Sequence, residues 1–590
     1  MNRRIILCII FLGFTLLVPQ PSQAEPLAFH VKAIQSVDRT WDDLSLLYPD
    51  QFHNSTEIIE EIANFEASVP ELVDVSVIGQ SVLGNDIQLV RITNEANTVQ
   101  KAGVFFVTQH HAREQITIEA TLRFILRLLN EYGEDEKITH YVDSEEIYII
   151  PTLNPDGNDI VVDGGNEWIR KNARRHDDDG DGLLDEDPLD DLNGDGKIYG
   201  IEYYEKPSPT WDLFDSGFTA WPVKTITEGK DNDEDGLVNE DVVGFTDLNR
   251  NYDSYWNDSS FTSGWDSDTT SETYPGTAPF SEPETAALRD FVLQHKFAAA
   301  ISLHSGINET YFPVSANNYY LEPVLYSELY TYLRVILPNR FLPWRGNSVN
   351  THITTSTAGE WSLWMYEEAG CEVPMTFEIY HNESALRENE CYFLLEENDT
   401  HQVWNWTGMY EHFAPEESAK NFDSLWEDIS PAFDYWMEIT PRLEVTVKST
   451  VFSGFDAGDV VTLEVDIENL SPFLSTLSVV EVTDENYNML TRNGVPVHTI
   501  AIVPEYKYST TIEFDLPHTI TDGSLNIMVG NEYTGYQKLM IGHQSTQTNT
   551  LSSSIETSSS SIPNGTSGLI LSSVLIILPL IAILRSRKKK

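Results

Sequence analysis

The chain has 590 residues, of which 93 are Asp or Glu and 36 are Lys or Arg, so its formal net charge is −57 at pH 7. Nucleic-acid-binding proteins carry basic patches, and this surplus of acid argues against that class. The length predicts several domains, with enough residues for sizeable cores.

The first 24 residues have the layout of a secretory signal peptide. Arg3 and Arg4 precede an apolar run over residues 5–18, and Ser22-Gln23-Ala24 predicts cleavage before Glu25. We therefore expect the chain to be exported.

Four predicted strands end in polar residues. The apolar runs 104–108, 147–150, 299–303 and 375–377 lead into His111-Ala112-Arg113-Glu114, Asn154-Pro155-Asp156-Gly157, His304 and Glu378. Ligands of open α/β sheets bind at the carboxyl ends of the strands, so these residues are expected to form one site.

The spacing of His111 and Glu114 favours a metal centre. Two such residues at a strand-to-helix turn can face one ion, and a third ligand would leave a position open for water, as in catalytic zinc sites. Taken singly, the pair is more often a solvated helix start, His304 a core histidine and Glu378 a surface carboxylate. Their joint placement at strand ends favours the site.

At this point the sequence resembles the zinc metallocarboxypeptidases of the carboxypeptidase A type. The resemblance covers most of residues 50–400 and implies an α/β fold with a mixed sheet, in a domain spanning residues 25–438. It rests on six motifs in family order: His111-Ala112-Arg113-Glu114, Asn154-Pro155-Asp156-Gly157, Trp168-Ile169-Arg170-Lys171-Asn172, Asp247-Leu248-Asn249-Arg250-Asn251-Tyr252, Ser302-Leu303-His304-Ser305 and Thr376-Phe377-Glu378.

The resemblance also implies the roles of individual residues. These are the zinc ligands His111, Glu114 and His304, the general base Glu378, the oxyanion-stabilising Arg170, and Asn249 and Arg250 on the substrate's terminal carboxylate. Such chemistry is coherent, because zinc lowers the pKa of a bound water toward about 7 and a carboxylate can then take its proton. A guanidinium matches a carboxylate bidentately, which selects the chain end of a peptide.

Two departures from the family pattern concern the substrate pocket. Many members have a Tyr on a mobile loop, and the corresponding residues 350–359 contain none. Glu360-Trp361 also replaces the usual Asp-Trp. The preferred C-terminal residue therefore does not follow from the resemblance.

An acidic insertion, residues 177–242, predicts calcium sites. Three loops alternate oxygen-bearing residues before a Gly, as calcium loops do, and the second ends in Glu at its twelfth position. The candidate ligands are Asp177, Asp179 and Asp181; Asp191, Asn193, Asp195 and Glu202; and Asp231, Asp233 and Asp235. The alternative is a solvated acidic segment, but carboxylates this close would repel without a cation. We expect isolated calcium loops rather than EF-hands.

The C-terminal part changes to a period-two pattern. Residues 439–543 contain short alternating strands and predict an all-β sandwich domain without catalytic residues. A Ser/Thr-rich stalk, 544–567, precedes an apolar run, 568–584, and a basic tail, 585–590. This predicts one transmembrane helix with the tail inside the cell and the rest outside. The alternative is a sorting signal that is cut off and replaced by another anchor.

Two cysteines remain after loss of the signal peptide. Cys371 and Cys391 flank the predicted Glu378 strand and can pair in an oxidising compartment, although the spacing does not establish this. Sequons such as Asn54-Ser55-Thr56 suit an exported glycoprotein.

These features predict an extracellular, membrane-anchored, zinc-dependent carboxypeptidase that acts on peptides with a free C-terminus, with zinc and calcium as cofactors. The alternative is a catalytically inactive, calcium-stabilised surface binding or adhesion protein on the same fold.

Overall fold

The computed structural model describes most of residues 37–542, together with 553–554. The longest gaps in the described chain are 214–220, 315–325, 338–356, 382–391, 414–421, 470–480, 498–505 and 543–552. The predicted signal peptide, membrane helix and basic tail lie outside the described residues. Within those residues, no helix combines the length and the apolar character that a membrane crossing requires.

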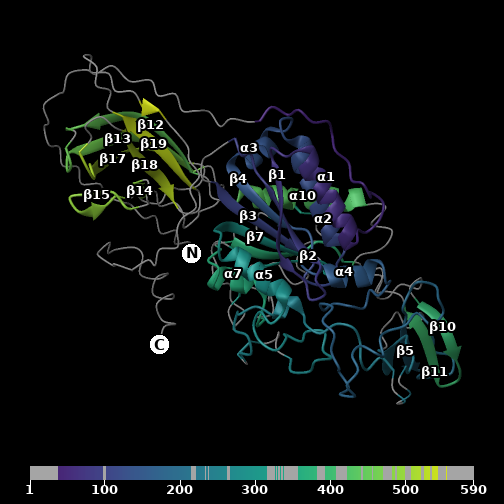
Figure 1. Cartoon of the computed structure of the whole chain (residues 1–590). Coiled ribbons are helices and arrows are strands. Elements are labelled where there is room, and N and C mark those ends of the chain that lie inside the picture. Colours follow the sequence, from purple (N-terminus) through teal and green to yellow (C-terminus); the bar gives the residue numbers. More distant parts are fainter. Residues whose placement is uncertain are drawn as a thin grey trace, which may run out of the picture.

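A mixed sheet lies at the centre of the N-terminal part (Figure 1), and among the described residues it has seven strands in the order β1-β2-β4-β3-β7-β9-β8. Its strands are β1 (Val73–Gln80), β2 (Asp86–Ile92), β3 (Ala102–Thr108), β4 (Glu145–Ile150), β7 (Phe297–His304), β8 (Thr310–Tyr311) and β9 (Val373–Glu378). β4, β3, β7 and β9 are parallel. The four predicted strands therefore exist and end at the same edge, as we expected.

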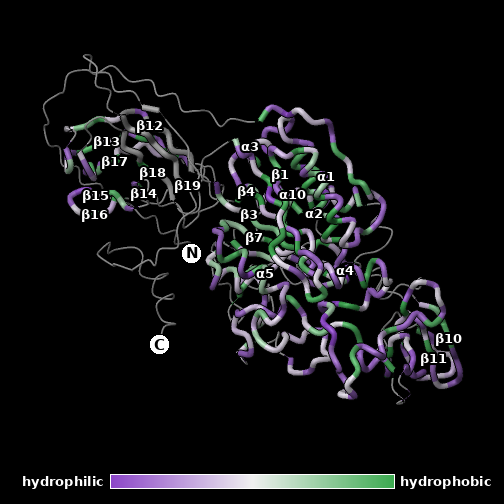
Figure 2. The backbone as a smooth tube through the Cα atoms, viewed as in Figure 1, coloured by the Kyte–Doolittle hydropathy of each residue, from purple (hydrophilic) through white to green (hydrophobic). Residues whose placement is uncertain are grey.

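Both faces of this sheet are buried by helices. Val104 and Phe106 of β3 face a core shared with α1 (Ser55–Ser68), α2 (Ile116–Glu131), α3 (Glu136–Ser144) and α10 (Phe422–Glu438). Phe105 and Val107 face the opposite core, with α5 (Pro283–Val292) and α7 (Trp361–Glu367). Alternate residues of a strand point to opposite faces, so a continuous apolar run suits a strand covered on both sides. Figure 2 shows apolar residues concentrated along these central strands.

A second sheet ties the acidic insertion to a distant segment, which the sequence did not indicate. It has the order β10-β11-β5-β6 among the described residues, formed by β5 (Gly200–Glu205), β6 (Lys224–Thr227), β10 (Tyr392–Glu397) and β11 (His401–Trp406). Tyr204, Tyr392 and Trp404 form its small core.

The C-terminal part contains short strands within residues 439–543, where the alternating pattern predicted them. One antiparallel sheet contains β12 (Leu443–Phe452), β13 (Val460–Asn469) and β17 (Tyr506–Asp515). Another contains β14 (Glu481–Asp484), β18 (Ser524–Asn531), β19 (Gly535–Gly542) and β20 (Ser553–Ser554), and β15 (Thr491–Arg492) pairs with β16 (Val495–Pro496). Buried residues of the first sheet, such as Leu463 and Phe514, share a core with Val482 and Ile527 of the second.

Candidate active site

His111 and Glu114 lie in the turn between β3 and α2. Gln109 begins this turn with a φ of 55°, a conformation uncommon for a residue with a side chain. Its side-chain amide donates to the carbonyl of Ala112, at 3.0 Å, and to Oδ1 of Asn158, at 2.7 Å. These hydrogen bonds fix the turn, so that both predicted ligands face the same side.

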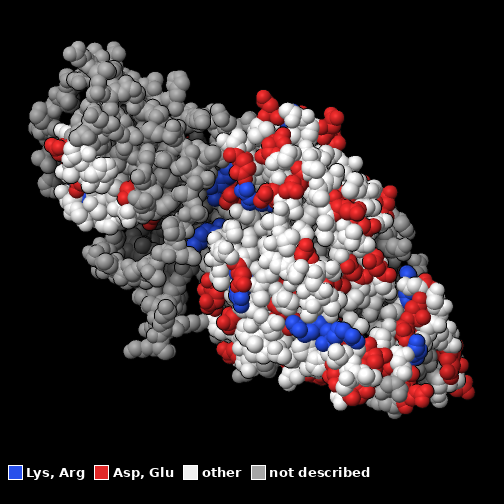
Figure 3. Space-filling view, in the orientation of Figure 1, with Lys and Arg blue, Asp and Glu red and all other residues white. Residues whose placement is uncertain are grey.

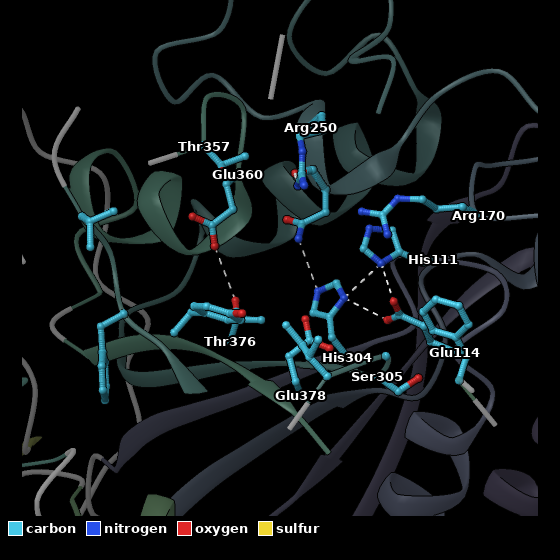
Figure 4. Close-up of a pocket in the computed structure, with 17 residues that line it drawn as sticks. His111, Glu114, Arg170, Arg250, His304, Ser305, Thr357, Glu360, Thr376 and Glu378 are labelled. Carbon is cyan, nitrogen blue, oxygen red and sulfur yellow. Dashed lines mark hydrogen bonds and ion pairs between the residues drawn. The ribbon is translucent and has the colours of Figure 1, made fainter. Parts of the chain in front are cut away.

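The third predicted ligand, His304, reaches the same point from the end of β7 (Figure 4). Nδ1 of His111 lies 2.7 Å from Oε1 of Glu114, and Nδ1 of His304 lies 2.9 Å from Oε2 of the same carboxylate. The two Nδ1 atoms are 3.2 Å apart. Tetrahedral zinc with ligands at 2.0–2.1 Å separates them by roughly 3.3 Å, so the three side chains fit such an ion.

The electrostatics of this cluster suit a cation. Burial alone would raise the pKa of Glu114, but the adjacent His111 and His304 lower it, and the carboxyl is ionised. Burial lowers the pKa of His304 more than Glu114 raises it, so the imidazole is neutral. Metal binding requires an ionised carboxylate and neutral imidazoles.

Asp247, which sequence reasoning did not single out, contacts the ring nitrogen of His111 that does not face Glu114. Its Oδ1 lies 3.1 Å from Nε2 of His111, and its Oδ2 accepts from Nε of Arg170 at 3.0 Å. The residue is fully buried. A carboxylate on the outer nitrogen fixes the tautomer of a metal-binding histidine. The sequence did contain a signal for this residue, because Asp247 opens one of the six motifs, two residues before Asn249.

His110 supports the other histidine. Its ring stacks on that of His304 with a centroid distance of 5.4 Å, and it lies between the hydroxyls of Tyr252 and Ser302 at 2.9 and 3.1 Å. Burial lowers its pKa well below the usual value, so it is neutral and adds no charge to the site.

Glu378 lies at the end of β9, paired in register with His304 of β7. Both residues line a cavity of about 360 Å³ that also contains Arg170 and Arg250. Oε2 of Glu378 is buried and has no hydrogen-bond partner among the described residues. Burial raises the pKa of this carboxyl well above its usual range, with a further rise from Glu114, against the lowering effect of Arg170.

Arg250 retains donors for an incoming group. Its Nη1 donates to the carbonyl of Asn249 at 2.7 Å, whereas its buried Nε has no hydrogen-bond partner among the described residues. The side chain of Asn249 is used within the protein, since its Oδ1 accepts from the amide of Trp361 at 3.1 Å and its Nδ2 lies 3.4 Å from Nε2 of His304. Of the two predicted carboxylate-binding residues, Arg250 is therefore the more available.

Comparison with known proteins decides the family. A sequence model described as zinc carboxypeptidase matches residues 58–408, more than half of the chain. The chain belongs to the zinc carboxypeptidase family. Membership implies zinc as the metal and peptides as substrates, and the cluster of His111, Glu114 and His304 fits that ion.

Individual relatives cover only parts of the family domain. A zinc carboxypeptidase of Saccharothrix mutabilis subsp. capreolus is 36% identical over 21% of this chain and 29% of its own length. An inactive metallocarboxypeptidase of Saccharomyces cerevisiae, ECM14, is 31% identical over 19% of this chain and 26% of its own length. The solved structure of thrombin activatable fibrinolysis inhibitor covers 66% of this chain and 76% of that chain, with 21% identity and a TM-score of 0.42. The chain spans less than half the length of the curated relatives it matches.

Glu360, one of the departures from the family pattern, lines the same cavity. Its Oε1 accepts from Oγ of Ser362 at 2.6 Å and lies 3.5 Å from Oγ1 of Thr376. Among the ion pairs of the described residues, none includes Glu360. Gly359 before it has a φ of +73°, and a Cβ there would lie 2.0 Å from the carbonyl oxygen of Arg250. Glycine is therefore required for this close approach.

The Asn-Pro-Asp-Gly motif at 154–157 does not line the cavity but supports residues that do. Asn154 caps α4 (Pro155–Val162) and donates to the carbonyl of Lys171 at 3.1 Å. Asp156 accepts from Ser81 and Asn85 in the turn between β1 and β2, at 2.6 and 2.8 Å. The motif therefore connects the segment that contains Arg170 to the central sheet.

The structure brings the predicted calcium ligands of the first acidic loop close together. The carboxylates of Asp177, Asp179 and Asp181 lie within 4.8 Å of one another. Asp191 accepts the amides of Gly194 and Gly196 at 2.7 and 2.6 Å. Two other predicted ligands of the third loop, Asp233 and Asp235, lie outside the described residues, as does Cys391, the predicted partner of Cys371.

Glu202, a predicted calcium ligand of the second loop, lies in the second sheet. It lies in β5, and its carboxylate accepts the hydroxyl of Tyr204 within the small core of the second sheet. Here the chain continues as a strand after Gly200, which turns Glu202 toward Tyr204.

Proposed function

We propose that the chain is an active zinc-dependent carboxypeptidase that hydrolyses C-terminal peptide bonds. The observation that carries this proposal is the convergence of His111, Glu114 and His304 beside a cavity lined by Glu378, Arg170 and Arg250. These residues come from separate parts of the chain, and each suits a different step of one reaction.

Each of the chain's own residues has a different role in this reaction. Zinc, when bound, supplies Lewis acidity that activates water and polarises a carbonyl group. Glu378 takes the proton from the attacking water and can return it to the leaving amine. Arg170, held by Asp247, places a fixed positive charge beside the cavity for the oxyanion that develops. Arg250 binds the terminal carboxylate of the peptide and so sets which bond is cleaved.

A catalytically inactive surface protein is the alternative. The inactive yeast relative and the absence of a Tyr in residues 350–359 favour it. The arrangement around Glu378 favours the enzyme, because a buried carboxylate oxygen without a hydrogen bond costs free energy that a purely structural site has no reason to keep.

The deciding experiment uses the full chain in detergent with peptide pairs that differ only in a free or amidated C-terminus. Cleavage of the amides should be slower by roughly one to two orders of magnitude, since a charge-assisted hydrogen bond contributes about 1.5–3 kcal/mol. Arg250→Ala should largely erase the difference. Glu378→Gln should keep zinc and lose turnover, and full activity in this variant would exclude Glu378 as the base. Internal cleavage products would exclude a carboxypeptidase.

We also propose the domain plan and location predicted above. The catalytic domain spans residues 25–438, a β-sandwich of residues 439–543 acts as a spacer or docking module, and residues 568–584 anchor the chain with the catalytic domain outside the cell. The core shared by β13, β17, β14 and β18 supports the sandwich. We further propose that the acidic insertion binds calcium, supported by the clustered carboxylates of Asp177, Asp179 and Asp181.

A further inference from the structure

Arg170 lies in a segment that has no regular secondary structure. Residues 168–172, the Arg170 segment, lie between α4 and the acidic insertion and belong to no helix or strand. Its backbone groups therefore find their hydrogen-bond partners in other parts of the protein rather than in a ladder of their own. The position of Arg170 depends on those partners.

Two hydrogen bonds join this segment to the turn between β3 and α2, which contains two of the predicted zinc ligands. The amide of Ala112 donates to the carbonyl of Arg170 at 3.1 Å. Nη1 of Arg113 donates to the carbonyl of Trp168 at 3.3 Å. Both bonds use backbone carbonyls of the segment, so the side chain of Trp168 is available for another contact.

The indole of Trp168 contacts both the acidic insertion and the second sheet. Its Nε1 donates to the carbonyl of Ile198, in the insertion, at 2.9 Å. Its ring meets the ring of Trp406, at the end of β11, edge to face, with centroids 5.7 Å apart and planes at 78°. Trp406 in turn packs against the small core of the second sheet. The start of the Arg170 segment is therefore held by two residues that lie outside the six family motifs.

Gly200 shows how closely the second sheet approaches this indole. It begins β5 and pairs with Trp406 of β11. A Cβ at this position would lie 2.9 Å from Cε3 of Trp406 and 3.1 Å from Cη2 of Trp168. Even one methyl group here would have to displace one of the two rings, so the contact between the segment and the second sheet is closely packed.

Trp168 does not itself reach the reacting groups. Of residues 168–172, all of which the structure describes, Arg170 alone lines the cavity (Figure 4). Its guanidinium is held by Asp247, whose Oδ2 accepts from Nε at 3.0 Å and lies 2.9 Å from Nη2. Such a two-point pair has a fixed geometry. A shift of the backbone at Arg170 would therefore break this pair or move the guanidinium within the cavity.

We propose that Trp168 is a positioning residue for Arg170, and that the second sheet acts through Trp168 on the charge that stabilises the oxyanion. This inference rests on the proposed function and deepens it, because it gives the acidic insertion a part in catalysis. A misplacement of about 1 Å at a catalytic group can lower a rate by roughly 100-fold. The insertion can therefore influence the reaction although no described residue of 177–242 lines the cavity.

The test combines a change at Trp168 with a change at Arg170 in the full chain. Trp168→Phe keeps an aromatic ring but loses the donor to Ile198, and it should lower kcat by roughly tenfold with KM and bound zinc nearly unchanged. Arg170→Ala should lower kcat by roughly 100- to 1,000-fold, as loss of an oxyanion-stabilising group does. Added to Arg170→Ala, Trp168→Phe should have almost no further effect, because residues that act through one group are not additive. An equal effect in both backgrounds would overturn the proposal.

A second measurement does not depend on turnover. A peptide phosphonate resembles the charged tetrahedral intermediate, so its affinity reports on the stabilisation of that charge. Trp168→Phe should weaken phosphonate binding by about the same factor as it lowers kcat, and should leave the binding of a free-acid product peptide unchanged. An equal loss for both ligands would show a general loosening of the site and would overturn the proposal.

Trp41→Phe is the matched control. Nε1 of Trp41 also donates to a backbone carbonyl, that of Leu129 at 3.1 Å, and neither residue lines the cavity. This variant should keep the native kcat, and a loss equal to that of Trp168→Phe would overturn the specific role of Trp168.

Gly200→Ala tests the same contact from the side of the insertion. Its methyl group displaces a ring, so kcat should fall as it does in Trp168→Phe. If Trp168→Phe fails to fold, Gly200→Ala with and without Arg170→Ala decides. Full activity in Arg170→Ala would refute the proposed role of Arg170 and this inference with it. An impaired Arg170→Ala beside fully active Trp168→Phe and Gly200→Ala would refute this inference alone.

Discussion

At the scale of single residues, Asp247 joins parts of the active site that lie far apart in the sequence. One carboxylate contacts His111, Arg170 and the amide of Asn249, which donates to Oδ1 at 2.9 Å. A change at this position therefore affects both the metal and the guanidinium.

We expect Asp247→Asn to weaken zinc binding by roughly 10- to 100-fold, as changes to partners of metal-binding histidines do. The amide can still accept from His111, but it loses the charge that holds Arg170, so kcat should fall as well. Zinc affinity is measured by equilibrium dialysis against a zinc buffer. Asp253→Asn, an exposed acid nearby, is the control, and equal zinc affinity in the two variants would contradict the role of Asp247.

The presence of Glu360 in the cavity predicts which C-terminal residue of a peptide the site prefers. It adds a carboxylate to a cavity with apolar walls that include Phe312 and Val314. A Lys or Arg side chain can place its stem against such walls and its charge near the carboxylate. Peptides ending in Lys or Arg should be cleaved faster than those ending in Leu.

The size of this preference follows from a charged hydrogen bond of about 1.5–3 kcal/mol. Glu360→Gln should lower kcat/KM for Lys-ending peptides by roughly tenfold or more and leave Leu-ending peptides nearly unchanged. Glu367→Gln, on α7, is the control. An equal loss on both kinds of peptide would assign Glu360 a structural role.

At the scale of elements, a buried histidine connects α1, α2 and the segment before them. Nδ1 of His53 lies 2.9 Å from Oε1 of Glu119, and its Nε2 lies 3.3 Å from Oε1 of Glu61, which also accepts the amide of Tyr48 at 2.9 Å. Burial alone would lower the pKa of His53, but the hydrogen bonds that its ring nitrogens donate to the two carboxylates outweigh this effect and raise the pKa to about 9.

This raised pKa predicts a loss of stability in alkali. The folded-state pKa exceeds the unfolded value of 6.5, so the contribution is fully present below pH 6.5 and is lost as the pH rises through 9. Its size is on the order of 3 kcal/mol. Melting temperatures recorded from pH 6 to pH 10 should fall more steeply for the native chain than for His53→Gln. Parallel curves would show that His53 is not charged in the folded protein.

The elements also show what local sequence patterns can predict. The strands ending near His111, His304 and Glu378 were predictable because a parallel sheet buried on both faces gives continuous apolar runs. The contact of Glu228 with the amides of Leu192 and Tyr199, in the acidic loop of residues 191–202, was not predictable. It depends on how β5 and β6 pair, and a twelve-residue pattern carries no information about the carboxylate that another segment supplies.

At the scale of the whole molecule, the first property to consider is the surface charge. Figure 3 shows groups of acidic side chains scattered across the visible face of the described residues, with basic ones in fewer places. A large net charge favours solubility and discourages self-association.

Topology gives a further prediction. If the N-terminal signal is removed and residues 568–584 cross the bilayer, protease added to intact cells should release a soluble fragment ending in the stalk of residues 544–567. The released fragment should keep the proposed peptidase activity, because the predicted catalytic residues precede residue 439. Protection from external protease in intact cells, but not in permeabilised cells, would place the catalytic domain on the inner side.

The second sheet makes the acidic insertion difficult to remove. β5 of the insertion pairs with β11, from His401 opposite Glu205 to Trp406 opposite Gly200. Deleting residues 177–242 would leave β11 with an open edge and uncover Trp404, beside the already exposed Phe393 and Leu394 of β10. An open edge next to apolar side chains promotes aggregation. A shortened chain would therefore need both segments trimmed together, β5 and β6 of the insertion with β10 and β11 of the distant segment.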